Sequence, residues 1–342
     1  MAHGLFQARS RLLFSLMVFS SPLGAQTLTS PARSITLPRE CQHPFRELYR
    51  YGGGQRLGLK VKSGFCRVDV VSGNVKMFSG LEDVKTIAPA PKSLLVAAVS
   101  GFYRLKVLND MGQSQFEGDL DSSGWTAIYW SNDESHVVVL SFRGEGDEAD
   151  TATIVNLTQK KMKSIDFNPP VPVRFDAKSE TIRAETVNGK TRKVAVYDLE
   201  GKLLPREAPQ NAQRERIESP NRTYYYFPKY EIGEGDTSIR KSSSGDVTLR
   251  LPEYKSVHSR NAALWDNPQW NPVDDNLLLA LYLPSGFGKE GIRGEIDVFS
   301  VSQGKVVRAF PVEEKATPAY GWSADGKHVV LCDVDCSFHS VP

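Results

Sequence analysis

Residues Gly321 to Leu331 read Gly-Trp-Ser-Ala-Asp-Gly-Lys-His-Val-Val-Leu, and this stretch decides the fold. An aromatic anchor, Trp322, comes first. A Ser-x-Asp-Gly turn follows, in which short polar side chains bond the nearby backbone and Gly accepts a positive φ. The β-branched and aliphatic run after the turn is typical of a buried strand. The stretch therefore predicts an aromatic-anchored turn that leads into a strand of a sheet.

The same order of anchor, polar turn and apolar strand recurs along the chain. The repeat is clear after two further tryptophans and weaker after a phenylalanine. At two isoleucines the turn and the strand are present, but the aromatic anchor is replaced. The anchors are Tyr49, Ile87, Trp130, Phe175, Ile217, Trp270 and Trp322, and the steps between them are 38, 43, 45, 42, 53 and 52 residues. Repeats of about 40 to 50 residues that contain several strands are typical of β-propellers.

A second motif accompanies the first, a strand that ends in a glycine-containing turn. It is clearest at residues 194–202, Val-Ala-Val-Tyr-Asp-Leu-Glu-Gly-Lys. Together with Trp-Ser-x-Asp-Gly-Lys at 322–327, this motif resembles TolB-like and WD-type β-propeller repeats over roughly Pro44 to Pro342. The resemblance implies an all-β propeller of four-stranded blades around a central channel, closed by an N-terminal strand. We expect seven blades, with six as the alternative if the Tyr49 unit merges with the last one.

The N-terminal residues indicate export. Arg9 and Arg11 precede an apolar run, and small residues near Ala25 suit cleavage, so residues 1–25 are expected to be a signal peptide. Residues 26–43 would form an arm in which residues 34–37 close the ring and so remove a sheet edge. Residues 44–342 would form the propeller. No other segment is long and apolar enough to span a membrane. We expect an exported monomer, periplasmic or secreted.

Charge and cysteine content limit the partners and the compartment. Without residues 1–25 the chain keeps 40 of its 42 basic residues against 40 acidic ones, so its formal charge is zero. This balance argues against nucleic acid or an anionic membrane as the main partner. The four cysteines predict two disulfides in an exported protein. Two arrangements stay open: Cys41 bonded to the Cys332 and Cys336 region, which would lock the ring, or Cys41 to Cys66 with Cys332 to Cys336.

Motifs for catalysis are absent from the sequence. It contains no nucleophile elbow, phosphate-binding loop, zinc-protease motif or dinucleotide fingerprint. His136 and His328 occupy the same repeat position, six residues after a tryptophan, which favours a structural role. We therefore expect no catalytic residue and no cofactor. Calcium is a weaker hypothesis at an acidic loop with Asp147, Glu148 and Asp150, because acidic glycine-rich turns are usually solvated.

The inner strand of each blade offers a candidate ligand site. Strand side chains alternate between two faces, so residues one, three and five before each anchor are expected to share a face toward the channel. Arginine forks suit carboxylate or phosphate, and aromatic faces suit rings or sugars. The alternative is that these groups satisfy one another, and a one-residue register error would reverse the face. The predicted channel residues are Trp125, Tyr129, Arg174, Arg214, Arg216, Trp265, Asn267 and Gln269.

These observations predict a binding or scaffolding module for a protein or a small anionic ligand. The alternative function is a propeller-type hydrolase or lyase that acts on glycans, with carboxylates from rim loops around Trp125 and Trp265. Carboxylates about 5 to 10 Å apart at the channel mouth would favour the enzyme. A third hypothesis is a purely structural envelope protein.

Overall fold

The structure is a computed structural model. It describes residues 31–45, 48–78, 81, 83–101, 103–121, 124–142, 148–188, 191–205, 217–227, 238–251, 264–283, 294–312 and 317–341. The described chain is almost entirely β, with two short 3-10 helices, η1 (Arg39–Cys41) and η2 (Gly52–Gly54). No helix in these ranges has the length and apolar character needed to cross a membrane.

The strands form antiparallel sheets, taken here in chain order. The first sheet contains β2 (Leu48–Tyr51), β3 (Arg56–Val61), β4 (Gly64–Asp69) and β5 (Val75–Phe78). The second contains β6 (Val84–Pro89), β7 (Val96–Ser100), β8 (Arg104–Leu108) and β9 (Ser114–Asp119). The third contains β10 (Trp125–Trp130), β11 (His136–Phe142), β12 (Glu148–Asn156), β13 (Lys161–Asp176), β14 (Thr181–Asn188) and β15 (Thr191–Tyr197).

Three further sheets complete the fold. The fourth contains β16 (Ile217–Glu218), β17 (Tyr224–Phe227), β18 (Ser238–Lys241) and β19 (Val247–Arg250). The fifth contains β20 (Leu264–Trp270), β21 (Leu277–Leu283), β22 (Gly294–Ser300) and β23 (Lys305–Val312). The last contains β24 (Ala319–Trp322), β25 (His328–Cys332) and β26 (Asp335–Ser340), and β1 (Arg33–Thr36) is its outer strand.

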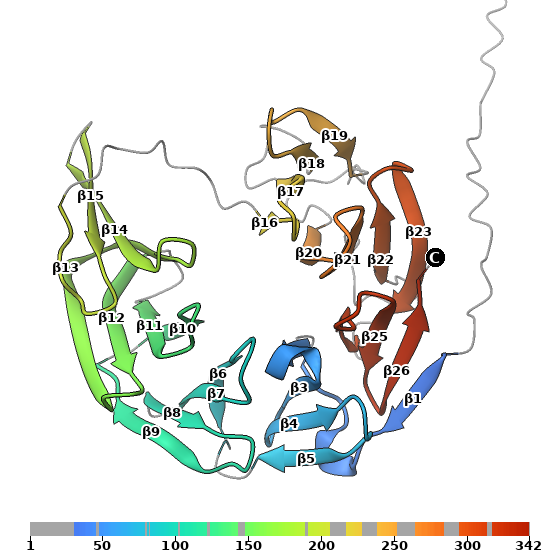
Figure 1. Cartoon of the computed structure of the whole chain (residues 1–342), viewed down its shortest axis with the longest axis horizontal. Coiled ribbons are helices and arrows are strands. Elements are labelled where there is room, and N and C mark those ends of the chain that lie inside the picture. The colour runs from blue at the N-terminus through green and yellow to red at the C-terminus, as the bar shows by residue number, and fades with distance from the viewer. Residues whose placement is uncertain are drawn as a thin grey trace, which may run out of the picture.

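The sheets lie side by side around a ring, which is the expected β-propeller (Figure 1). In the part of the chain that the structure describes, the strands form six separate hydrogen-bonded sheets, which matches the alternative count rather than seven. The difference arises in the six-stranded sheet, which holds both the Trp130 and the Phe175 repeats. Its long strand β13 pairs with β12 as far as Pro172 and then with β14 from Val173 to Asp176. One continuous strand thus ends one repeat and begins the next, so the strands of both repeats are joined in one sheet.

The N-terminal strand closes the ring, as expected. Strand β1 pairs with β26, with Arg33 opposite Phe338 and Ile35 opposite Cys336. A buried cluster joins the last sheet to the first at this seam, so closure is stabilised by apolar burial as well as by backbone hydrogen bonds. Its members include Ile35, Leu37, Cys41, Leu57, Leu59, Cys66, Ala319, Val330, Cys332, Cys336 and Phe338.

Both disulfides lie in this seam cluster, and their pairing is Cys41 with Cys66 and Cys332 with Cys336. Of the two arrangements left open by the sequence, the one with Cys41 bonded to Cys66 is therefore confirmed, and the one with Cys41 bonded to the last blade is wrong. Cys332 and Cys336 face each other directly across the β25–β26 hairpin, with a Cα–Cα distance of 4.0 Å. Two disulfides are consistent with an exported protein.

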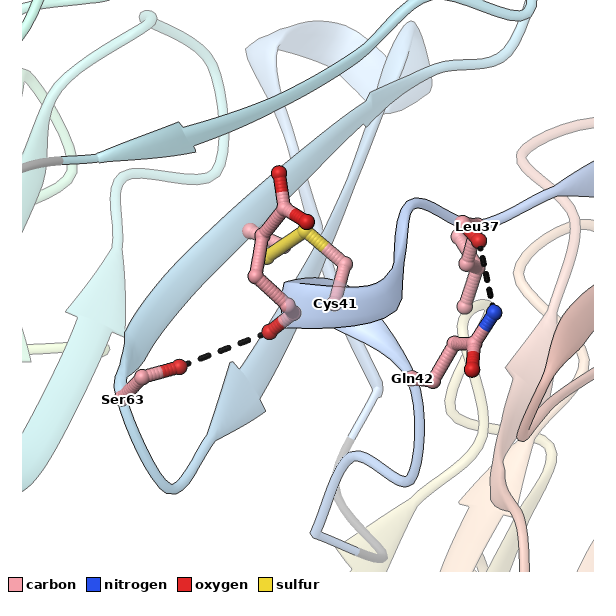
Figure 2. Close-up of a disulfide and its surroundings, with 6 residues drawn as sticks. Leu37, Cys41, Gln42 and Ser63 are labelled. Atoms are coloured by element: carbon pink, nitrogen blue, oxygen red, sulfur yellow. Dashed lines mark hydrogen bonds between the residues drawn. A yellow bond between two sulfur atoms is a disulfide. The ribbon is translucent and has the colours of Figure 1, made fainter.

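Helix η1 brings Cys41 beside β4, where Cys66 lies (Figure 2). The Gln42 side-chain amide donates to the Leu37 carbonyl at 3.0 Å, and the Ser63 hydroxyl donates to the Glu40 carbonyl at 3.4 Å. Strand β1 belongs to the last sheet and Cys66 to the first. The Cys41–Cys66 bond therefore ties the segment that follows the closing strand to the sheet on the other side of the seam.

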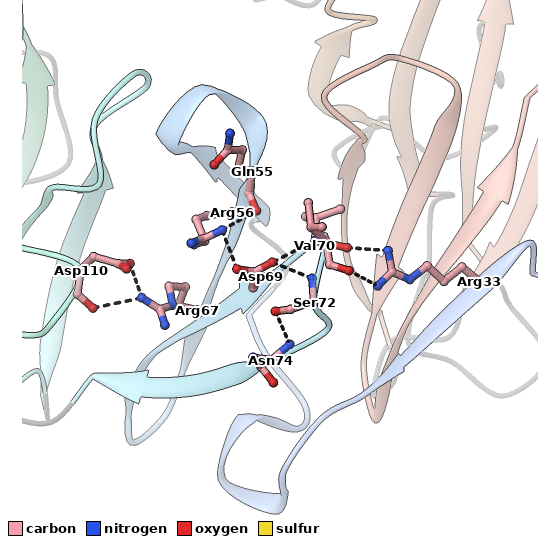
Figure 3. A network of polar contacts seen from close by, with 10 residues as sticks. Arg33, Gln55, Arg56, Arg67, Asp69, Val70, Ser72, Asn74 and Asp110 are labelled. Atoms are coloured by element: carbon pink, nitrogen blue, oxygen red, sulfur yellow. Dashed lines mark hydrogen bonds and ion pairs between the residues drawn. The ribbon is translucent and has the colours of Figure 1, made fainter.

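A polar network reinforces the same seam (Figure 3). The Arg33 guanidinium donates to the Val70 and Val71 carbonyls, which connects β1 to the first sheet. Arg56 pairs with Asp69 at 2.7 Å. The hydrogen bond from the Ser72 backbone is the main reason that the pKa of Asp69 lies below its usual range.

The network also extends in the other direction, because Arg67 of β4 pairs with Asp110 of the second sheet. The last, first and second sheets are thus linked by named polar contacts (Figure 3).

The tryptophan anchors pack between neighbouring repeats. The indole N–H of Trp130 donates to the Ala88 carbonyl at 2.8 Å, that of Trp270 to Ile217 at 2.7 Å, and that of Trp322 to Gln269 at 3.0 Å. Each acceptor lies on the inner strand of the preceding repeat. A buried indole needs such a partner, so the anchors are structural.

The turns show that two predicted anchors were misplaced. The backbone N–H of Ser131 bonds to the His136 carbonyl, and Ser323 and Ser219 make the equivalent bonds to His328 and Tyr224. Ser219 therefore occupies the position of Ser131 and Ser323, so Glu218, and not Ile217, is equivalent to the tryptophan anchors.

Similarly, the Ala90 N–H bonds to the Leu95 carbonyl, which places Pro89 rather than Ile87 at the anchor position. Neither repeat has an aromatic anchor, so its sequence contained no side chain that fixed the register.

In two of the described turns an acidic residue bonds to the turn of the preceding repeat. The Glu134 carboxylate accepts from the backbone N–H groups of Lys92 and Ser93 at 2.5 and 2.7 Å. Glu180 accepts from the Asn132 N–H at 2.5 Å. Glu134 and Glu180 have φ values of 58° and 53°, a left-handed conformation that costs a non-glycine residue about 1 to 2 kcal/mol. The charge-assisted hydrogen bonds offset this cost.

Candidate functional site

The histidines of two turns take part in networks of polar contacts. In one of them, the Ser131 hydroxyl donates to the Asp133 carboxylate at 2.7 Å, and His136 Nδ1 lies 2.8 Å from the Ser135 hydroxyl. His136 Nε2 lies 3.0 Å from the side-chain amide of Asn156. The hydrogen bond from Ser131 is the main reason that the pKa of Asp133 lies well below its usual range. The Ser131 hydroxyl thus donates to the Asp133 carboxylate, and the Ser135 hydroxyl contacts both that carboxylate and the imidazole.

His328 repeats this arrangement in the last sheet. The Ser323 hydroxyl donates to Asp325 at 2.6 Å, and His328 Nδ1 lies 3.9 Å from the same carboxylate. Two copies of one network at equivalent positions are what a turn-stabilising role predicts.

Three predicted channel residues make contacts within the ring. The Tyr129 ring lies 5.6 Å from the Phe175 ring of the following repeat. The Gln269 side chain donates to the Tyr320 carbonyl at 3.3 Å. Arg174 pairs with Glu185 at 3.2 Å, and its side chain is 38% exposed.

The other members of the predicted set are less defined. Trp265 and Asn267 belong to β20, whose backbone is described there although these two side chains are not. Arg214 and Arg216 lie outside the described residues. The register of the fourth sheet makes Ile217, not Arg216, the equivalent of Tyr129.

Both faces of an inner strand are used for packing, as β10 shows. Ile128 and Trp130 pack into a cluster with the second sheet. Ala127 and Tyr129 pack on the other side, into a cluster with residues of β13 and β14. The sequence predicted that one face of each inner strand packs against a neighbouring blade and that the other face lines the channel. In the described part of β10, neighbouring repeats take both faces, so the predicted residues are not gathered into one site there.

Among the predicted residues whose side chains are described, Trp125 is the most exposed. It is the first residue of β10 and remains 46% exposed. Its ring stacks on Phe142 with centroids 3.9 Å apart and planes inclined by 8°. Phe142 covers one face of the indole and fixes its orientation. The structure therefore presents a flat aromatic face at the edge of the ring.

Four further side chains lie at the same edge. Phe45 precedes β2, Lys60 lies near the end of β3, Lys85 lies near the start of β6, and Tyr103 lies between β7 and β8. The inner strands β2, β6 and β10 all start at this edge. Their partners β3 and β7, which run antiparallel to β2 and β6, end there. We refer to Phe45, Lys60, Lys85, Tyr103 and Trp125 as the basic aromatic rim.

Cations and aromatic rings are paired within the rim. The Lys60 ammonium lies 5.5 Å from the centroid of the Phe45 ring and donates to the Lys85 carbonyl at 2.6 Å. The Lys85 ammonium lies 4.3 Å from the centroid of the Tyr103 ring and 3.2 Å from its hydroxyl. These contacts hold the two ammonium groups near the aromatic rings of adjacent sheets.

No described carboxylate neutralises the two rim lysines. Neither Lys60 nor Lys85 has a salt bridge to another described residue. On the same edge, Asp333 is paired with His43 at 2.8 Å, and Asp83 is exposed beside the start of β6. Each ammonium has three N–H donors and uses one of them in these contacts. The rim can therefore offer charged donors to an anion.

Sequence reasoning found Trp125 but missed the rest of the rim. Phe45, Lys60, Lys85 and Tyr103 lie outside the anchor-and-turn repeat, and they come together only through strand pairing. The sequence feature that could have identified these residues is their position at the ends of strands that meet at one edge of the sheets. A search for residues before anchors could not include them.

The acidic loop is partly described. Asp147 lies outside the described residues, Glu148 begins β12 with an exposed side chain, and Asp150 follows in the same strand. The described residues include no group of three or more His, Cys, Asp or Glu side chains placed to hold a metal ion. Calcium binding stays a prediction.

Comparison with known proteins supports the fold. No protein-family model and no curated protein sequence matches the chain. Among solved structures, hydrazine synthase from Kuenenia stuttgartiensis matches with a TM-score of 0.51 at 15% identity, over 89% of this chain and 97% of that chain. A chain of the mitotic checkpoint complex matches with a TM-score of 0.56 at 10% identity, over 100% of this chain and 98% of that chain. These similarities extend to the β-propeller fold and no further.

Proposed function

We propose that this chain is an exported β-propeller that acts as a binding or scaffolding module, and that a protein or a small anionic ligand binds at the basic aromatic rim. The observation that carries the proposal is the open, oriented face of Trp125 on the same edge of the sheets as two lysines that have no carboxylate partner among the described residues. Exposed aromatic residues next to spare charged donors are typical of recognition surfaces.

Two further observations support export and the repeat type. The disulfides Cys41–Cys66 and Cys332–Cys336 suit an oxidising compartment, and the N-terminal sequence has the features of a signal peptide. The Trp-Ser-x-Asp-Gly-Lys turn and the inter-repeat indole hydrogen bonds support TolB-like or WD-type repeats.

The proposal is tested with a thermal-shift screen of the mature protein against carboxylates, phosphates, sugars and sulfated compounds, together with affinity capture of protein partners. A ligand at about 100 times its dissociation constant should add about 2.7 kcal/mol to the free energy of unfolding. The rim variants are Trp125→Ala and the double variant Lys60→Gln/Lys85→Gln. The matched control is Lys178→Gln, an exposed lysine in the turn after β13 at the opposite edge.

A ligand or partner that is lost from the rim variants and kept by the control supports the proposal. Binding that both rim variants keep at full strength contradicts it. A complete absence of rim-dependent binding, in a protein that unfolds cooperatively, also contradicts it and favours a purely structural role.

A further inference from the structure

The basic aromatic rim has the chemistry of a site for a charged sugar. We infer that its ligand is a carboxylated oligosaccharide, with a sugar ring on Trp125 and carboxylates at Lys60 and Lys85. This inference rests on the proposed function and specifies its ligand class.

The state of Trp125 favours a sugar ring. Phe142 covers one indole face at 3.9 Å in a nearly parallel stack, so the other face is a single flat platform of fixed orientation. A pyranose presents flat patches of C–H groups that pack on such a face. Little side-chain entropy is lost on binding, because the indole is already held in place.

The lysines favour carboxylates on that sugar. Each ammonium is a compact point charge with three N–H donors. Lys60 uses one of them on the Lys85 carbonyl and Lys85 uses one on the Tyr103 hydroxyl, so two donors of each remain for a ligand. The Lys60 ammonium bonds to the Lys85 carbonyl at 2.6 Å, so the two cationic side chains lie at one junction between the first and second sheets. A ligand with successive carboxylates can engage both of them.

The rim is continuous across three sheets, which suits an extended ligand. The Phe45 N–H bonds to the Lys60 carbonyl at 2.8 Å, and the Lys60 side chain reaches the start of β6. One residue after Lys85, the Thr86 hydroxyl lies 2.9 Å from the Thr126 hydroxyl of β10. Aromatic and cationic groups therefore follow one another from the first sheet to Trp125.

The backbone of the rim favours a glycan over an acidic peptide. A peptide that binds in extended form gains most from backbone donors and acceptors, as in strand addition. At the rim the Lys85 carbonyl already accepts from Lys60, and the Thr126 carbonyl accepts from Thr86 at 3.0 Å. These two carbonyls already bond to side chains of the ring, and the chemistry that the described rim side chains present is flat aromatic faces and ammonium groups.

The test is isothermal titration calorimetry of the mature protein with hexagalacturonate. Its methyl ester, with the same backbone and no charge, and hexaglutamate, with the charge and no sugar ring, are the comparison ligands. Hexagalacturonate is expected to bind about tenfold more tightly than either. Raising the ionic strength from about 0.1 to about 1 M should weaken it, since the screening length falls from about 10 to about 3 Å.

Variants assign the binding to the rim. Trp125→Ala is expected to weaken hexagalacturonate binding by about threefold to tenfold, and Lys60→Gln/Lys85→Gln by about tenfold. Trp125→Phe keeps an aromatic platform and should lose less, which separates lost stacking from misfolding. Lys178→Gln should bind as the unchanged protein does.

Three results overturn the inference. Equal binding of hexaglutamate shows that charge alone is recognised; the glycan is then wrong, although the rim remains a binding surface. If other anions bind in the thermal-shift screen and hexagalacturonate does not, the glycan is likewise wrong and the rim remains a binding surface. Hexagalacturonate binding that is unaffected by the rim variants shows that the site lies elsewhere.

Discussion

Removing the Cys41–Cys66 disulfide should destabilise the protein more than removing Cys332–Cys336. All four cysteines are fully buried in the same seam cluster, so replacing either pair by alanine removes similar packing. The bonds differ in the chain they close, with sequence separations of 25 and 4 residues. Constraint of the unfolded chain then contributes about 3.5 kcal/mol for the first bond and about 2 kcal/mol for the second.

These values translate into melting temperatures. An unfolding entropy of about 2.1 cal/mol/K per residue gives about 0.6 kcal/mol/K for a chain of about 300 residues. Cys41→Ala/Cys66→Ala should therefore lower the melting temperature by about 6 °C and Cys332→Ala/Cys336→Ala by about 3 °C, measured by differential scanning calorimetry. Hydrogen exchange should also show that β1 loses protection in the first variant, because, of the two disulfides, Cys41–Cys66 is the one that ties the closing segment to the first sheet.

The reverse order of the two melting temperatures would refute this reasoning. So would unchanged protection of β1 in Cys41→Ala/Cys66→Ala, because the seam would then be held without the bond. Peptide mapping of the unreduced protein must also recover the two pairs as stated.

Three further predictions concern the repeats and one buried acid. Glu134→Ala should lower the free energy of unfolding in urea by about 2 to 3 kcal/mol, because it removes both hydrogen bonds to the preceding turn. Glu134→Gly should be less destabilising by about 1 kcal/mol, since glycine tolerates the φ of 58°; equal effects would contradict the assigned conformation. Trp322→Phe should cost about 1 to 3 kcal/mol by leaving the Gln269 carbonyl without its indole donor, and an unchanged urea midpoint would contradict that hydrogen bond. Burial, with a smaller contribution from Glu295, raises the pKa of Asp297 to about 8. The unfolded state ionises at lower pH than the folded state, so stability should fall from about pH 4 to about pH 8. Asp297→Asn should remove most of this fall in stability with pH. A variant whose stability falls with pH as in the unchanged protein would contradict the raised pKa of Asp297.

The sequence predicted those parts of the fold that the repeats encode locally. The Trp322 stretch, the turns and the closing strand at residues 34–37 all follow from side chains close together in the chain, and the structure confirms them. The blade count depended on whether β13 would run unbroken between two repeats. No local residue pattern marked that strand as shared.

The register of the anchors shows a different limit. At Glu218 and Pro89 the repeat has no aromatic side chain, and an error of one or two residues left the expected face of each strand uncertain. The candidate site depended on that face, and also on the view that neighbouring blades cover only one side of an inner strand. Tyr129 against Phe175 shows that they cover both in β10.

The rim could not be predicted, because it is a product of assembly. Lys60 and Lys85 come from different sheets, and their proximity follows from the packing of the first sheet against the second. Only Trp125 was identified, through its position in the inner strand.

The central claim is that the basic aromatic rim is the binding surface, and hydroxyl-radical footprinting tests it most directly. Trp125 and Phe45 are 46% and 52% exposed, and Met111, in the turn between β8 and β9 at the opposite edge, is 67% exposed. Saturating hexagalacturonate is predicted to slow oxidation of Trp125 and Phe45 and to leave Met111 unchanged. Protection of Met111, or unchanged oxidation of both rim residues, would contradict the claim.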